Sequence, residues 1–289
     1  MRVGYACLTL GVIGIDYRSC LKKNAGEDVL ASLIAHNLSS LTRAVLYNTK
    51  NCIRLFRITS DLIPFGSSPV NTLDWPGLYA AELAHIGQLI RRGGLRVSMH
   101  PGQYTVLNSP RQDVYQRAAD DLVYHCRILD SLALDRSHKI ILHVGGRYDD
   151  KASAMRRFAE GWRRLGAAVR ARLVIENDDK IFTAREVFEL GRQLGIPVVF
   201  DSLHHELNHE PDSPGPEVWI KRCRETWLPA DGPQEIHYSQ QHPERRSGSH
   251  SDTIELDTFI AFCRNIGDSD LDIMLEVKCL YRSYVPVNC

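Results

Sequence analysis

The sequence lacks a Cys-x-x-Cys pair, an uninterrupted apolar run long enough to cross a membrane, and an excess of either charge. Its eight cysteines are scattered, which excludes zinc-finger spacing and indicates reduced thiols in a cytosol rather than a disulfide framework. Without a run of about 18 apolar residues no membrane span is expected. The amino-terminal MRVGYACLTL is too short and too weakly flanked for a secretory signal. We therefore expect a cytoplasmic protein, or a nuclear one in a eukaryote.

The charge balance excludes one mode of nucleic-acid binding. The 35 basic residues equal the 35 acidic ones, which argues against a protein that coats nucleic acid by bulk charge. The charge balance does not exclude a local basic face around an acidic site. The basic clusters on predicted helices are expected to be solvated outer faces.

Eight short apolar segments alternate with helical patterns through the chain. The expected strands are 2–8, 52–58, 95–100, 138–144, 172–176, 196–201, 234–238 and 271–276. The expected helices are 27–47, 75–92, 111–134, 151–170, 183–194, 216–226 and 252–265. Eight parallel strands joined by helical crossovers close into a (β/α)8 TIM barrel, whereas an open doubly wound sheet would normally have fewer strands. We expect one domain over 1–289, with the last helix short or missing because only 13 residues follow the eighth strand.

Metal-capable side chains stand at or next to the ends of six of these strands. In RLVIENDD the apolar run delivers Glu176 to its end. The full set is His100, His143, Glu176, Asp201, His237 and Glu276. Because the carboxyl ends of barrel strands meet at one mouth, we expect a ring of ligands there.

Imidazoles and carboxylates without thiolates suit Zn²⁺, Mn²⁺ or Fe²⁺. His100, His143 and Glu176 are expected to converge on one ion, with Glu176 bridging to a second ion. The second ion would be held by Asp201, His237 and Glu276, and a third by His204 and His250, with Glu235 as a further carboxylate. Divalent ions about 3.5–4 Å apart suit in-line displacement at phosphorus.

Several neighbouring residues have structural alternatives. Asp178 and Asp179 are as suited to capping a helix as to binding metal, and His205 and His209 are ambiguous beside His204. The histidines on helices or before a strand are expected to be surface or packing residues; they are His36, His85, His125 and His138.

Local signals support the element boundaries. Asp74 is expected to cap the helix at Trp75, Asp179 or Thr183 to cap the helix after Glu176, and Gly195 to end that helix. Three connections at the mouth are long, namely 59–73, 101–110 and 202–215.

Motifs through nearly the whole chain resemble those of the UV damage endonuclease family. They are GYACL at 4–8, RITSDLIPF at 57–65, HPGQYTVLNSP at 100–110, HVGGRYDDK at 143–151, IENDDK at 175–180, FDSLHHELN at 200–208, HYS at 237–239, Ser-x-His-Ser-Asp at 248–252 and IMLEVK at 273–278. The HPGQY and ENDDK stretches are the specific ones.

The resemblance implies a TIM barrel with two or three divalent ions, usually Mn²⁺, with Zn²⁺, Co²⁺ or Mg²⁺ as alternatives. It implies incision of double-stranded DNA immediately 5′ to cyclobutane dimers and 6-4 photoproducts, leaving a 3′-hydroxyl and a 5′-phosphate. It implies no membrane and no obligate protein partner. Family ligands carry over onto His100, His143, Glu176, Asp201, His204, His237, His250 and Glu276.

The resemblance also implies lesion contacts. The family uses the pair at Gln103 and Tyr104 to wedge into the duplex where damaged bases are turned out, replacing lost stacking and pairing. The alternative for Tyr104 is a loop aromatic that packs on its own barrel.

Further site residues are expected beside this pair. Tyr5 would reach the mouth and help orient a phosphate or the lesion, and Lys278 would meet phosphate from the face of Glu276. Both join Glu176 as expected catalytic residues, and Tyr5 is also expected to bind the lesion. Thr9 and Asn108 are expected near DNA, although the family commonly has Asn where this chain has Thr9, which weakens an amide contact there.

Glu235 stands where relatives often have a lysine that can be carboxylated. We expect this glutamate to act as a native acid on the metal. The alternative is that it points toward the mouth without binding an ion.

Three other functions compete. An apurinic-site endonuclease uses a similar cluster, a sugar isomerase or epimerase uses two ions on a small polyol, and a damage-binding module would lack catalysis. HPGQY discriminates against the sugar enzyme, which has no use for a protruding Gln-Tyr pair.

Overall fold

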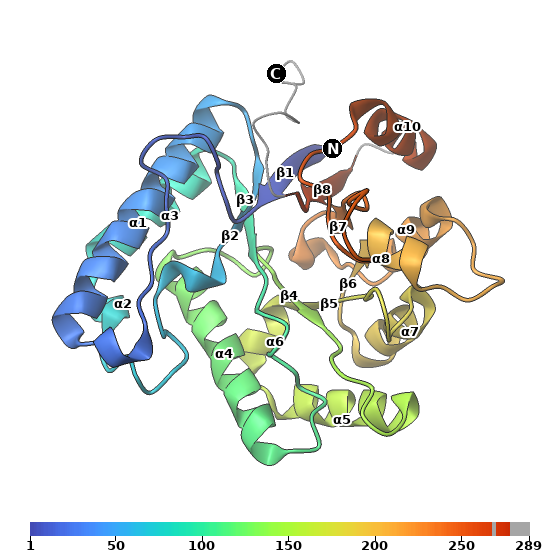
Figure 1. Ribbon diagram of the computed structural model, residues 1–289, viewed down its shortest axis with the longest axis horizontal. Helices are drawn as coiled ribbons and strands as arrows, with labels where there is room; N and C mark the ends of the chain where they lie inside the picture. Colours follow the sequence, from blue (N-terminus) through green and yellow to red (C-terminus); the bar gives the residue numbers. More distant parts are fainter. Residues whose placement is uncertain (268–269, 278–289) are drawn as a thin grey trace.

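Eight parallel strands form a closed barrel in sequence order in the computed structural model, which describes residues 1–267 and 270–277 (Figure 1). The strands are β1 Arg2–Ala6, β2 Leu55–Ile58, β3 Arg96–Met99, β4 Ile140–His143, β5 Leu173–Glu176, β6 Val198–Asp201, β7 Gln234–Tyr238 and β8 Leu271–Leu275. Each lies within its predicted segment, and β1 pairs with β8 to close the barrel. The predicted TIM barrel is confirmed.

Helices surround the barrel (Figure 1). They are α1 Glu27–Lys50, α2 Trp75–Leu78, α3 Ala80–Arg92, α4 Gln112–Ser131, α5 Lys151–Arg164, α6 Ala167–Arg172, α7 Ala184–Leu194, α8 Ser202–Leu207, α9 Pro216–Arg224 and α10 Leu256–Ile266, with short 3-10 turns η1 Lys22–Asn24, η2 Ser60–Leu62 and η3 Pro229–Asp231. Two predicted helices are each split in two, and α8 lies in a segment predicted to be a loop. The predicted short or missing last helix falls outside the described residues.

Helix caps explain the start and end of α7. Thr183 accepts a hydrogen bond from the Glu186 backbone while Glu186 reaches back to the Thr183 backbone, which is a full capping box. Asp179 instead pairs with Lys180 at 2.8 Å. Gly195 ends the helix with φ 67°, as predicted. Asp74 precedes α2 but makes no side-chain capping bond, so that prediction is wrong.

The inside of the barrel has an apolar half and a polar half. Residues two positions before a mouth ligand share its inward face, since side chains alternate along a strand. On β4, β5 and β6 these are Ile141, Val174 and Val199, which form their own buried cluster. On β3 and β7 the equivalent positions are Ser98 and Glu235, which are buried and polar.

One helix has a length and composition that would allow a membrane span. That helix is α1, yet Ile34, Leu38 and Leu41 are part of the main hydrophobic core. Its buried Asn37 donates to the Leu62 backbone at 3.1 Å. We conclude that α1 is a core helix of the barrel.

The cysteines depart from expectation at one position. Cys7, Cys20, Cys126, Cys223 and Cys263 are free. Cys52 is disulfide-bonded, so the expectation of reduced thiols is wrong there.

Candidate metal centre at the barrel mouth

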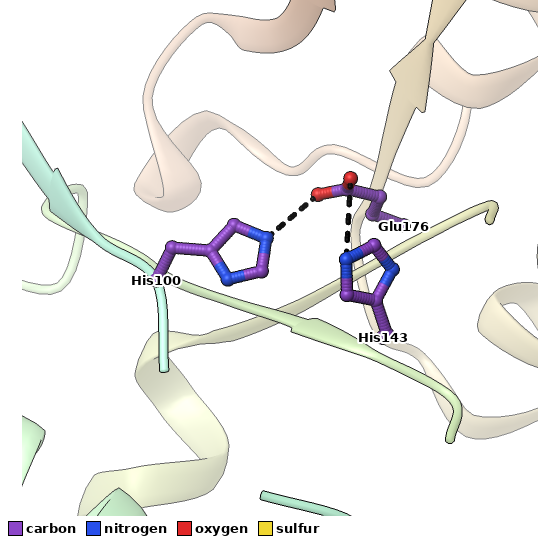
Figure 2. Close-up of side chains that lie close together, drawn as sticks. All are labelled: His100, His143 and Glu176. Carbon is purple, nitrogen blue, oxygen red and sulfur yellow. Dashed lines mark hydrogen bonds and ion pairs between the residues drawn. The ribbon is translucent and has the colours of Figure 1, made fainter. Parts of the chain in front are cut away.

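Glu176 ends β5 and is approached by two histidines from the two preceding strands, β3 and β4. His100 follows β3 and places Nε2 at 3.2 Å from Glu176 Oε2, while His143 ends β4 with Nε2 at 3.7 Å from Glu176 Oε1 (Figure 2). The pairing of β4 with β5 sets His143 directly beside Glu176. Figure 2 shows both imidazoles pointing at the one carboxylate.

Two more imidazoles reach Glu176 from the other side. His204 lies on α8, where the Asp201 side chain caps the helix by accepting from the His204 backbone at 2.7 Å. Its Nδ1 lies 3.4 Å from Glu176 Oε1. His237, on β7, places Nδ1 at 3.0 Å from Glu176 Oε2. The carboxylate of Glu176 is therefore the point at which four histidines meet.

Three overlapping groups in the described part of the chain have ligand atoms within 4.8 Å of one another. They are His100–His143–Glu176, Glu176–Asp201–His204 and Asp201–His237–Glu276. Glu176 and Asp201 each belong to two groups, as bridging ligands do. His250 stands beside the third group, with Nδ1 at 3.6 Å from Glu276 Oε2.

Buried polar atoms at the centre test whether it suits a cation. Within residues 1–267 and 270–277, Glu176 Oε1, Asp201 Oδ2 and His237 Nδ1 are buried without a hydrogen-bond partner. Such atoms are costly unless something satisfies them. Oxygen and imidazole nitrogen donors without sulfur suit a divalent cation of intermediate hardness. The residues present therefore fit a divalent metal centre.

Burial and neighbouring charges shift the pKa values at the centre in opposite directions. Burial opposes protonation of His204, but Asp201 and Glu176 outweigh it and raise its pKa to about 11. Burial likewise opposes protonation of His237, and the charge of Glu176 overcomes it to raise the pKa to about 10. Burial raises the pKa of Asp201. For Glu176, burial acts upward, but His237 and His143 hold its pKa well below the usual range. Cation binding must therefore displace protons.

Arg57 belongs to the centre and was not predicted as a site residue. It lies on β2 inside the RITSDLIPF motif, donates to Glu276, and places Nη2 at 2.7 Å from His237 Nε2. Alternation along β2 would have placed it inside the barrel, but nothing in the sequence singles out its partners.

Glu235 is buried behind His237 and lies outside the three groups found among the described residues. Its Oε1 accepts from Ser98 Oγ at 3.1 Å and lies 3.8 Å from His237 Nε2. The acids Glu176 and Glu276 face the other edge of the ring, at Nδ1. The other oxygen of Glu235, Oε2, is buried without a hydrogen-bond partner in the described part of the chain, so a metal-side role for Glu235 stays a prediction.

The loop after His100 projects from the protein. Gln103 and Tyr104 are exposed, and the Tyr104 side chain is 74% exposed. The next residue anchors the loop, because buried Thr105 donates to Asp121 Oδ2 at 2.6 Å. The structural alternative, in which Tyr104 packs on its own barrel, is thereby disfavoured.

A cavity of about 350 Å³ lies between this loop and the centre. Its lining includes Gly102 and Gln103 of this loop, Tyr148 and Lys180 of the next two loops, and the candidate ligand His143. The cavity thus joins the exposed loop to the candidate ligands.

Three predicted site residues are placed away from the open mouth. Tyr5 is 1% exposed, and its hydroxyl binds Thr9 Oγ1 at 2.6 Å and Asn48 Oδ1 of α1 at 2.8 Å. Alternation explains this, because Ala6 pairs with Arg57 and so takes the inward face of β1. The expectation that Tyr5 reaches the mouth is corrected, and Thr9 is buried with it.

Asn108 is fully buried and donates to the Gly146 backbone at 2.7 Å, which ties the loops after β3 and β4 together. Gly145, with φ 110°, allows this approach, since an added Cβ would lie 2.4 Å from Asn108 Oδ1. Asn108 therefore shapes the mouth from behind. Lys278 lies outside the described residues.

The ambiguous residues are also placed. Asp178 caps its own loop by accepting from the Lys180 and Phe182 backbones, both at 2.9 Å. His205 faces away from the centre, with Nε2 at 3.2 Å from the Pro214 carbonyl oxygen. His209 is exposed. The three candidate groups in the described residues contain none of these.

Comparisons with known proteins agree with this geometry. Residues 2–280 match the UV-endonuclease UvdE family. The UV DNA damage endonuclease of Clostridium perfringens (strain 13 / Type A) is 40% identical over 279 residues, 96% of this chain and 68% of the relative. That of Bacillus pumilus (strain SAFR-032) is 33% identical over 262 residues, 90% of this chain and 82% of the relative.

Solved structures show the same fold. The crystal structure of SacUVDE matches with TM-score 0.90 at 35% identity, covering 96% of this chain and 93% of its own. Endonuclease IV from Thermus thermophilus matches with TM-score 0.59 at 15% identity, covering 96% and 92%. D-Psicose 3-epimerase from Clostridium cellulolyticum matches with TM-score 0.57 at 14% identity, covering 96% and 85%. The last two share the fold alone.

Proposed function

Since this chain belongs to the UV-endonuclease UvdE family, we propose that it cuts the backbone of UV-damaged double-stranded DNA immediately 5′ to cyclobutane dimers and 6-4 photoproducts. The products would be a 3′-hydroxyl and a 5′-phosphate. The observation that carries the chemistry is the buried Glu176 carboxylate with four imidazoles around it.

The centre would hold two or three divalent cations, Mn²⁺ first, with Zn²⁺, Co²⁺ or Mg²⁺ as alternatives. The residues that would hold them are His100, His143, Glu176, Asp201, His204, His237, His250 and Glu276. Bound divalent cations supply Lewis-acid activation of a phosphodiester and lower the pKa of water. Glu176 and Asp201 belong to two groups each, so each would contribute ligand atoms to two neighbouring cations.

The protein itself arranges the reacting groups. Glu176 holds His100 and His143 in one orientation, and the closed barrel keeps that carboxylate from water. A buried, prearranged set of charges stabilises developing charge on phosphate more strongly than water does. A scissile phosphate placed over Glu176 would lie at the mouth, beside the loop that carries Tyr104.

Lesion recognition would use the exposed loop and the cavity beside it. Insertion of Gln103 and Tyr104 into the duplex replaces stacking and pairing when bases leave the helix, which takes a few kcal/mol. The cavity of about 350 Å³ lies next to His143, so an extruded nucleotide there would sit against the centre. The protein would meet damaged DNA in the cytoplasm of a bacterium or in the nucleus of a eukaryote. Incision as proposed needs no protein partner.

Defined duplexes test the proposal. The protein with Mn²⁺ should incise a duplex carrying a single cyclobutane dimer or 6-4 photoproduct on its 5′ side, and leave the undamaged duplex intact. Cutting only at an abasic site would favour the apurinic-site endonuclease reading. Sugar turnover without DNA cutting would favour an isomerase or epimerase.

A further inference from the structure

Arg57 is buried one layer beneath the mouth of the barrel. On β2 it pairs in register with Ser98 of β3, two residues before His100, and it is 5% exposed. A guanidinium stays charged at any pH the protein meets, so this position holds a permanent positive charge under the candidate cation centre.

Its two terminal nitrogens contact two different candidate ligands. Nη1 donates to Glu276 Oε1, and Nη2 lies 2.7 Å from His237 Nε2. The other ring nitrogen of His237 and the other carboxylate oxygen of Glu276 do not contact Arg57 and lie toward the mouth. His237 Nδ1 lies 3.0 Å from Glu176 Oε2, and Glu276 Oε2 lies 3.6 Å from His250 Nδ1.

Three carboxylates act on the guanidinium of Arg57. Glu176, Glu235 and Glu276 all act on it from β5, β7 and the end of β8. Arg2 and Arg96, at the starts of β1 and β3, are engaged elsewhere, because Arg2 Nε and Arg96 Nη1 each lie 2.6 Å from an oxygen of Asp272. Arg57 is thus the arginine placed against the acids of the centre.

These contacts have opposing effects on a bound cation. The planar fork of a guanidinium fixes two partners in one set geometry, whereas the donors of an ammonium rotate freely on a flexible stem. A positive charge within a few ångströms also repels a divalent cation in a low-dielectric site. We propose that Arg57 is a positioning residue that fixes Glu276 and His237 for the reaction and weakens cation binding. This inference rests on the cation centre of the proposed function.

Two variants separate the fork from the charge. Arg57→Lys keeps the charge and loses the fork, while Arg57→Gln loses both. Arg54→Gln is the matched control, because Arg54 lies just before the same strand and its side chain donates to the Thr49 backbone at 3.3 Å. Mn²⁺ affinity is measured on the full chain by electron paramagnetic resonance, and incision by single-turnover cutting of a dimer-containing duplex.

We expect Arg57→Gln to bind Mn²⁺ at least about tenfold more tightly than the parent protein and to incise at least about a hundredfold more slowly. Arg57→Lys should keep Mn²⁺ affinity within about threefold and still incise at least about tenfold more slowly. The Arg54→Gln control should match the parent protein in both measurements.

Other results would overturn the inference. Weaker or unchanged Mn²⁺ binding by Arg57→Gln would show that its charge does not limit affinity. Should Arg57→Gln fail to fold, parent-like incision by Arg57→Lys would refute the positioning role. Failure of the parent protein to bind Mn²⁺ is a distinct result, since it would refute the cation centre itself.

Discussion

Replacing Glu176 by glutamine tests the bridging role that the geometry gives this carboxylate. The change keeps the side-chain shape but removes one charge and turns one oxygen into an amide donor. That donor would face an imidazole nitrogen, either of His237 at 3.0 Å or of His204 at 3.4 Å. The variant therefore loses both a ligand atom and the charge that two groups share.

The expected loss follows from electrostatics. One negative charge and a divalent cation about 4 Å apart interact by roughly 8 kcal/mol at an effective dielectric constant of about 20. Even a quarter of that value, about 2 kcal/mol, weakens binding by about 30-fold. Incision should fall to about a thousandth or less, because the electrostatic stabilisation of the phosphate is lost as well.

Mn²⁺ titration and single-turnover incision measure the two losses separately. Glu189→Gln, the same exchange at an exposed position of α7, should leave both unchanged. Far-ultraviolet circular dichroism checks that Glu176→Gln is folded. Parent-like Mn²⁺ affinity or incision in the folded variant would refute the reasoning.

Three further predictions address recognition, proton release and stability. Tyr104→Ala should reduce the discrimination of damaged from intact duplex in a binding assay far more than it reduces the cutting rate, because Tyr104 is 74% exposed and distinct from the ligands. Leu228→Ala, at a position that is 60% exposed, is the control. A Tyr104→Ala variant that keeps a lesion preference of about tenfold or more, about 1.4 kcal/mol, contradicts the wedge. Mn²⁺ affinity should rise from pH 6 to pH 8, by up to about tenfold per pH unit for each proton released. The reason is that the pKa values of His204 and His237 are raised to about 11 and about 10, so their protons must leave when the cation binds. Calorimetry showing pH-independent affinity would contradict this prediction. Thr183→Ala should lower the free energy of unfolding in urea by about 1 kcal/mol, because it removes the hydroxyl that accepts from the Glu186 backbone in the capping box. Thr42→Ala, which removes a hydroxyl that donates to the Leu38 carbonyl within α1, is the control. Unchanged stability of Thr183→Ala would show that the cap contributes nothing.

The barrel and most of the ring follow from the sequence because most of the ligands stand at or next to the end of an apolar strand. Glu176 and Asp201 are the last residues of β5 and β6, and parallel strands bring such ends to one edge. The exposed pair at Gln103 and Tyr104 was predicted from the family resemblance, because no hydrophobic periodicity in the sequence singles it out.

The sequence did not predict how deep a residue lies along the barrel or which face of a strand without ligands points inward. Glu235 shares the inward face of His237, but alternation gives the face of a strand and not the depth along the barrel. Tyr5 was misplaced because β1 carries no ligand from which to count its faces. The partners of Arg57 lie on β7 and after β8, and such long-range contacts appear only in the folded chain.

Anomalous diffraction at the manganese edge, from crystals grown with Mn²⁺, tests the central claim most directly. We predict one peak within ligand distance of Glu176 together with His100 and His143, and a second peak near Asp201, His237 and Glu276. Crystals that contain manganese elsewhere, with no peak at Glu176, would contradict the account.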